Sequence, residues 1–167
     1  MLLALEISTV LLVAITMGMA LAHALELPGK LRLDEQTYLS VQRIYYPGFT
    51  IGGVAEPLAL FAAFTLLFFH KDRTHFWLIL TAFSGLLGMQ IVFWSVTQTA
   101  NRFWLRHDHL GTSGARFFAL NRAKQGSEGK RSTPNWQSMR DQWEYSHVLR
   151  AVLSMISLVA IVIALAT

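Results

Sequence analysis

The sequence predicts an all-α fold, a bundle of four transmembrane helices with a short cytoplasmic interfacial helix between the first two. Of the 167 residues, 53% are hydrophobic and only 14% are charged, whereas a soluble domain carries about a quarter charged residues. Four apolar stretches are long enough to cross a hydrocarbon core of about 30 Å. We therefore expect residues 1–167 to form a single integral membrane domain, with spans over about 2–25, 49–69, 76–98 and 142–166.

The first span is interrupted only by Glu6 and His23. The tripeptide around His23 is similar to a signal-peptide cleavage site, but no basic segment precedes the apolar run. The run is also longer than the hydrophobic region of a signal peptide, which usually has about 7–15 residues. The stretch therefore predicts a transmembrane helix rather than a signal peptide. Three small residues at helical spacing form a ridge typical of close helix packing: Ala14, Gly18 and Ala22.

A short helix is expected between the first two spans. Asp34 is a suitable N-cap, and Pro47-Gly48 ends the segment after Tyr46. Its apolar and aromatic side chains favour a position on the membrane surface: Tyr38, Leu39, Val41, Ile44 and Tyr45.

The remaining spans follow from the lengths of their connections. The link over residues 70–75 is short, so the second and third spans are antiparallel neighbours. A more polar helical segment continues the third span to Trp104. Thr133-Pro134 supplies N-cap and first-turn residues for the last helix, which is longer than the bilayer and therefore extends into the cytoplasmic interface.

The basic residues predict the orientation. Both long loops, residues 26–48 and 102–141, are rich in Lys and Arg, so the positive-inside rule places them in the cytoplasm and both termini outside. We expect an integral protein of a bacterial inner membrane, and the basic charge requires no nucleic-acid partner. Eleven of the 14 basic residues contribute: Lys30, Arg32, Arg43, Arg102, Arg106, Arg116, Arg122, Lys124, Lys130, Arg131 and Arg140.

Polar residues gather at the cytoplasmic ends of the spans. A charged side chain in a bilayer costs about 2.5–3.5 kcal/mol on insertion scales, and such residues are usually paired or functional. We therefore expect one cavity built from two His–Glu pairs, a further carboxylate, an arginine and a polar stripe on the third span: His23, Glu26, Glu144, His147, Glu56, Arg150, Gln90, Trp94, Gln98 and Asn101.

Two chemistries fit this set. Helical bundles hold di-metal sites with Glu and Glu-x-x-His ligands, which makes non-haem iron or another metal a candidate cofactor, with His23, Glu26, Glu56, Glu144 and His147 as ligands. The alternative needs no metal: a His–Glu pair deprotonates an acidic organic substrate, and polar groups stabilise the resulting anion. A haem between the two histidines is a third arrangement. Because the chain has no cysteine, disulfides and thiolate ligands are excluded.

Several blocks of the sequence resemble the DUF1772 family of four-helix membrane proteins, which includes the anthrone oxygenases. These blocks are residues 22–31 and 38–45, residues 142–147 with Arg150-Ala151, and the Trp94 to Trp104 segment with Asn101. Thr99-Ala100 stands where the family usually has a proline before that asparagine. The resemblance implies oxidation of a polycyclic phenolic anthrone to a quinone by dioxygen in some members.

The sequence thus predicts a membrane oxidoreductase of the oxygenase type that acts on a small hydrophobic molecule, and the resemblance implies that this substrate is a polycyclic aromatic compound. The expected partners are the lipid bilayer and that substrate, and a homo-oligomer stays open. A non-catalytic accessory or assembly subunit is the alternative; transport ranks last because no broken helix is expected. The predicted catalytic residues are His23, Glu26, Glu144, His147 and Asn101, and the predicted substrate-binding residues are Trp94, Gln98 and Arg150.

Overall fold

The computed structural model describes residues 1–70, 72–104 and 135–167, and this part of the chain is helical without strands. Four of its helical stretches are long and apolar enough to cross a membrane. The all-α fold and the four helices of spanning length are therefore confirmed. Their bounds are Leu2–Lys30, Gly48–Leu66, Arg73–Arg102 and Trp136–Ala166.

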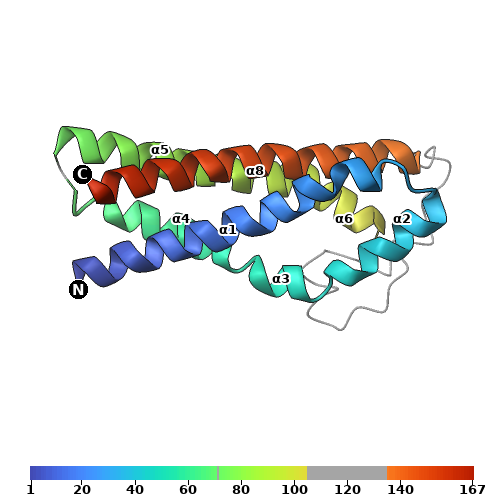
Figure 1. The fold of residues 1–167 in the computed structure, drawn as a ribbon, viewed down its shortest axis with the longest axis horizontal. Helices are drawn as coiled ribbons and strands as arrows, with labels where there is room; N and C mark the ends of the chain where they lie inside the picture. The colour runs from blue at the N-terminus through green and yellow to red at the C-terminus, as the bar shows by residue number, and fades with distance from the viewer. Residues whose placement is uncertain (71, 105–134) are drawn as a thin grey trace, which may run out of the picture.

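The long helices run side by side, as Figure 1 shows, with α1 and α5 both packed against α8. Both chain termini and the connection between α4 and α5 lie at one end of the bundle, whereas α2 lies at the other end (Figure 1). The elements, in order, are α1 (Leu2–Lys30), α2 (Glu35–Gln42), the 3₁₀ helix η1 (Arg43–Tyr45), α3 (Gly48–Gly52), α4 (Ala55–Leu66), α5 (Arg73–Val92), the π-helix η2 (Phe93–Thr97), α6 (Gln98–Trp104) and α8 (Trp136–Ala166).

The short helix after the first span begins where the sequence predicts. Asp34 is its N-cap, and its carboxylate accepts a hydrogen bond from the Thr37 amide at 2.8 Å. This hydrogen bond lowers the pKa of Asp34. One face of α2 and η1 packs on the bundle, because Tyr38 and Tyr45 are buried in one cluster with Trp143. These helices therefore close one end of the bundle.

The second span is broken, contrary to the expectation of unbroken helices. α3 ends at Gly52 and α4 begins at Ala55. Pro57 has no amide hydrogen to donate to the Gly53 carbonyl four residues earlier, and that carbonyl instead accepts from the Glu56 amide at 3.1 Å. The proline and the adjacent glycines thus explain the break.

The third span contains a π-helical turn over Phe93–Thr97. Such a turn inserts an extra residue into the α-helical register. Residues beyond it are therefore rotated, relative to Gln90, from the positions that a regular α-helix would give them.

The last helix, α8, begins at Trp136, and the Asn135 side chain caps it by accepting from the Gln137 amide at 3.2 Å. The predicted cap at Thr133-Pro134 lies outside the described residues. As expected, this helix is longer than its apolar part, since it carries Arg140, Asp141 and Glu144 before the apolar stretch.

Small residues let α5 and α8 approach closely. A Cβ atom at Gly85 would lie 2.3 Å from Ser157 Oγ and 2.9 Å from the Leu153 carbonyl oxygen. By contrast, the ridge predicted on α1 is not a packing face, because Gly18 is exposed and has no atom within 4 Å of a Cβ position. The buried face of α1 is formed instead by a stripe of period close to 3.5 residues: Thr9, Val13, Thr16, Ala20, His23 and Lys30.

Candidate functional site

A cavity of about 310 Å³ lies where α3 and α4, η2 and α8 face one another. All four spans contribute to its walls, which are mostly aromatic and aliphatic. A cavity with apolar walls and a few convergent polar groups is typical of a small-molecule site. Its lining residues are Met19, Ala20, His23, Gln42, Tyr45, Tyr46, Phe49, Thr50, Gly53, Val54, Glu56, Pro57, Gln90, Phe93, Trp94, Thr97, Asn101, Trp143, His147 and Arg150.

Two imidazoles meet in this cavity. The rings of His23 and His147 lie with their centroids 4.2 Å apart at an interplanar angle of 40°. Tyr45, Phe49 and Trp143 surround His23 with centroid distances of 4.6, 4.5 and 4.9 Å. Both histidines are 95% buried, so two helices distant in sequence place their imidazoles in one apolar enclosure.

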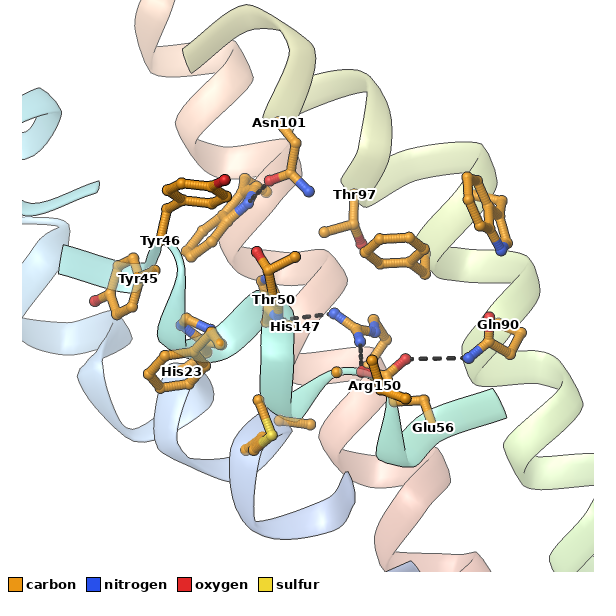
Figure 2. Close-up of a pocket in the computed structure, with 18 of the residues that line it drawn as sticks. His23, Tyr45, Tyr46, Thr50, Glu56, Gln90, Thr97, Asn101, His147 and Arg150 are labelled. Carbon is orange, nitrogen blue, oxygen red and sulfur yellow. Dashed lines mark hydrogen bonds and ion pairs between the residues drawn. The ribbon is translucent and has the colours of Figure 1, made fainter. Parts of the chain in front are cut away.

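A chain of hydrogen bonds crosses the cavity from α5 to α8 (Figure 2). Gln90 donates to Glu56 at 3.2 Å, and Arg150 forms an ion pair with Glu56. Arg150 also lies 3.1 Å from Nδ1 of His147. A guanidinium can only donate, so His147 Nδ1 accepts, and a neutral His147 carries its proton on Nε2.

A second polar network lies on the α2 side of the cavity. The Lys30 ammonium is 2.8 Å from Glu26 and 3.6 Å from Glu144. Tyr45 donates to Glu26 at 2.5 Å, and Tyr38 donates to Glu144 at 2.9 Å. Burial, together with the carboxylate partner, raises the pKa of each phenol, so both tyrosines stay protonated donors.

This network also closes the cavity. The Lys30 ammonium lies over the rings of Tyr45 and Trp143, 4.6 and 4.7 Å from their centroids. Trp143 in turn donates from Nε1 to Asn101 at 2.8 Å. The end of the bundle covered by α2 is thus sealed by an aromatic layer held by one buried cation.

The structure divides the predicted site residues into two groups. Those that line the cavity are His23, Glu56, Gln90, Trp94, Asn101, His147 and Arg150. Glu26 and Glu144 belong instead to the network around Lys30, and neither expected His–Glu pair forms a hydrogen bond; Nδ1 of His23 is 3.9 Å from Glu26. Glu144 shares a helix face with His147, but its carboxylate is directed to Tyr38 and Lys30.

Gln98 does not line the cavity, although α-helical spacing predicts that it follows Trp94. Thr97 lines the cavity instead; it lies seven residues after Gln90 and four before Asn101, which is also α-helical spacing. Gln98 is 1% exposed and accepts a hydrogen bond from Asn101 at 3.3 Å. It therefore orients Asn101.

The carboxylates and imidazoles do not assemble into a metal site. Within the described ranges, no group of three or more His, Asp or Glu side chains lies close enough to hold an ion. Glu56 is engaged by Arg150, while Glu26 and Glu144 are engaged by Lys30. The near-stacked histidine rings also leave no space for a porphyrin between them. The donor set thus fits neither a di-metal centre nor a haem held by both histidines.

Sequence reasoning missed several residues that shape this site. The sequence indicates only a basic loop residue at Lys30, yet this side chain is 4% exposed. It lies four residues after Glu26, a spacing that pairs charges on a helix and offered a usable signal. Phe49 and Trp143 gave no comparable signal, because an aromatic residue at a span end is equally typical of an interface.

The opposite end of the bundle has a smaller polar contact. His70 Nε2 lies 2.9 Å from a Glu6 carboxylate oxygen, so the isolated acid near the start of α1 has a partner. His75 and Asp72 pair nearby, with Nδ1 of the histidine 2.5 Å from the carboxylate. This cluster lies beyond the apolar core formed by residues such as Leu66, Ile79 and Ile161 and is separate from the cavity.

Comparisons with family models, with curated proteins and with solved structures find no match to this chain. The resemblance to the anthrone oxygenase-like family stays a prediction from the sequence blocks. The interpretation of the cavity consequently depends on its own geometry and chemistry.

Proposed function

We propose that this chain is an integral membrane oxidoreductase of the oxygenase type, which binds a small hydrophobic aromatic molecule in the cavity around His23 and His147. The observation that carries this proposal is the pairing of two buried imidazoles with an arginine inside an aromatic enclosure. Aromatic walls favour flat apolar rings, and imidazoles are the commonest groups for proton transfer.

Insertion into a bilayer is supported by where the apolar surface lies. Only 17–39% of each apolar window is buried inside the bundle, although the windows have mean hydropathies of 1.6–2.6. An exposed apolar surface of this extent marks a membrane or partner interface. We propose the bacterial inner membrane as the location, with the termini outside and α2 at the cytoplasmic interface, because the basic segments 26–48 and 102–141 are joined in sequence to helix ends on the α2 side.

The two histidines take different roles in this proposal. Since Arg150 donates to His147 Nδ1, the Nε2–H of His147 is a donor suited to a developing oxyanion. Nδ1 of His23 has no hydrogen-bond partner among the described residues, and the nearest carboxylate, that of Glu26, is 3.9 Å away. Since no donor is bound to this nitrogen, a neutral His23 is available to accept a proton. His23 is therefore the proposed base.

The chemistry proposed is deprotonation followed by oxidation. His23 removes a proton from a phenol or from a carbon beside a ketone, and His147 stabilises the anion. Dioxygen then accepts the electrons: a ring CH₂ group and O₂ become a ring C=O group and one water molecule. Because the donor set does not fit a metal, the proposed reaction assigns proton transfer to the protein and electron donation to the substrate itself.

The test uses purified protein in mild detergent with anthrone as the substrate, following oxygen uptake and quinone absorbance. Removal of a general base is expected to slow turnover by about 10²–10⁴-fold, so His23→Ala should lose nearly all activity. His147→Gln keeps an N–H donor and should retain more activity than His147→Leu. Val152→Ala, at an exposed position on α8, is the matched control.

Two outcomes would overturn the proposal. Oxygen uptake by His23→Ala equal to that of the unmodified protein would exclude His23 as the base. Stoichiometric iron or another metal in the active preparation, lost on Glu56→Gln, would instead favour the metal-dependent alternative.

The second candidate function is a non-catalytic assembly subunit. It is favoured by one specific observation: the two buried carboxylates, Glu56 and Glu144, and the exposed carboxylate of Glu26 already have basic or hydrogen-bonding partners, as a purely structural network requires. Under this alternative Glu144→Gln is silent, His147→Leu leaves the fold unchanged, and no oxygen uptake is seen with either variant or with the unmodified chain.

A further inference from the structure

The residues that line the cavity are exposed on one side only. Among the lining residues, Val54 and Trp94 are 55% and 56% exposed, and Pro57 beside them is also exposed. The other lining residues are buried or partly buried. The opening therefore lies between the second span, which carries Val54 and Pro57, and the third span, which carries Trp94.

Two departures from regular α-helix produce this opening. The break between α3 and α4 lets the two helices take different partners: α4 packs on α1 and α5, whereas α3 packs on α1 and η1. Figure 1 shows α3 set apart from α5 and α8. Trp94 lies in the π-helical turn on the facing span. Both irregular segments line the cavity.

The opening lies at membrane depth. Val54 and Pro57 lie inside the apolar stretch Gly48–Leu66, and Trp94 lies inside Arg73–Arg102. In contrast, the α2 end of the cavity is closed by Tyr45, Trp143 and the Lys30 network. For a bundle inserted as proposed above, the opening faces hydrocarbon rather than water.

The polar groups limit the kind of ligand. Arg150 is already matched by Glu56, so the cavity offers hydrogen-bonding groups without an unmatched charge. The rim itself is apolar or aromatic. These features fit a neutral molecule with one phenol or ketone group and an otherwise apolar body, and they disfavour an anion that would have to leave water.

We propose that the cavity takes its ligand sideways from the bilayer, through a portal bounded by Val54, Pro57 and Trp94, and that this ligand is a neutral, lipid-dissolved aromatic phenol or ketone. This inference rests on the proposed membrane insertion and hydrophobic ligand. It adds the route of entry and the charge of the ligand.

The test measures binding rather than turnover. The protein is reconstituted in phosphatidylcholine vesicles, and 1-hydroxypyrene is the neutral probe, detected by quenching of tryptophan fluorescence. Since the chain has no cysteine, Val54→Cys can be labelled selectively with a bulky maleimide. The label should slow probe association by about tenfold, within the range by which association rates change among variants of one site.

The matched control is Leu58→Cys with the same label. Leu58 lies in α4, four residues after Val54; it is 51% exposed and does not line the cavity. Its label should leave the association rate unchanged. Trp94→Ala, which widens the rim without a label, should increase the rate.

Three results would overturn the proposal. Equal rates for the labelled Val54 and Leu58 variants would exclude the portal. Absence of saturable quenching by 1-hydroxypyrene, or equally tight binding of pyrene-1-sulfonate, would exclude the neutral ligand class. Because the binding assay does not require oxygen, slower probe association in the labelled Val54 variant supports the portal even if the protein shows no oxygen uptake. If the protein does take up oxygen but the label does not change probe binding, the portal is rejected and the proposed function is not.

Discussion

The charged partner that each polar side chain contacts decides its environment in this protein. Arg150 contacts both Glu56 and His147, so a single guanidinium joins the carboxylate of one span to the imidazole of its own helix. Breaking a buried ion pair by removing one partner leaves an uncompensated charge, whereas replacing both partners is often neutral. The stability of the bundle should therefore depend on the pair rather than on either residue alone.

The first prediction concerns this pair. Arg150→Met leaves Glu56 with only the Gln90 amide at 3.2 Å, and the free energy of unfolding should fall by about 3–5 kcal/mol. The double variant Arg150→Met with Glu56→Leu should recover most of this loss. Denaturation in detergent followed by circular dichroism measures both values; equal instability of the single and double variants would contradict a paired role.

At the scale of helices, the contact between α5 and α8 depends on a small residue at one position. Gly85 faces Ser157 and the Leu153 carbonyl, whereas Gly88, one turn further on, has only the flexible end of Leu153 near it at 3.5 Å. Alanine is favoured over glycine in a helix by about 1 kcal/mol. Substitution at these two positions therefore separates helix propensity from packing.

We expect Gly85→Ala to destabilise the bundle by about 1–3 kcal/mol, because overpacking forces the helices apart. Gly88→Ala should instead be neutral or stabilising by up to about 1 kcal/mol. Thermal unfolding in the same detergent compares the two variants. Equal stabilities would show that α5 and α8 tolerate a wider spacing than the structure has.

At the scale of the whole molecule, the two ends of the bundle differ in chemistry. The end with both termini contains an apolar core with one histidine–glutamate contact, and the α2 end contains the cavity and the network around Lys30. Most of the basic residues lie in the sequence segments 26–48 and 102–141, which follow or precede helix ends on that side. The orientation of the α2 end in a membrane decides which compartment Glu26 faces, since the Glu26 side chain is 42% exposed.

The positive-inside rule predicts that this end is cytoplasmic. Reporter fusions after Ala115, which lies outside the described residues, and after Thr167 should give cytoplasmic and external signals, respectively. An external signal at residue 115 would reverse the orientation and place the Lys30 network on the outer face.

The sequence by itself determined the four helical stretches of spanning length, their approximate bounds and the end of the bundle where polar residues gather. These features follow from the lengths of apolar runs, from the Asp34 cap and from the positions of charges, all of which act locally. Tertiary structure alone decided how the polar residues are partnered. Glu26 and Glu144 turn to Lys30 rather than to histidines, because partners are chosen among helices that are distant in sequence.

The same distinction explains the opening of the cavity. Pro57 and the preceding glycines made a break in the second span foreseeable, but the π-helical turn over Phe93–Thr97 has no local signature in the sequence. A π-helical turn persists when packing against neighbouring helices stabilises it. The sequence therefore determined which residues can do chemistry, and packing decided which of them meet in one cavity.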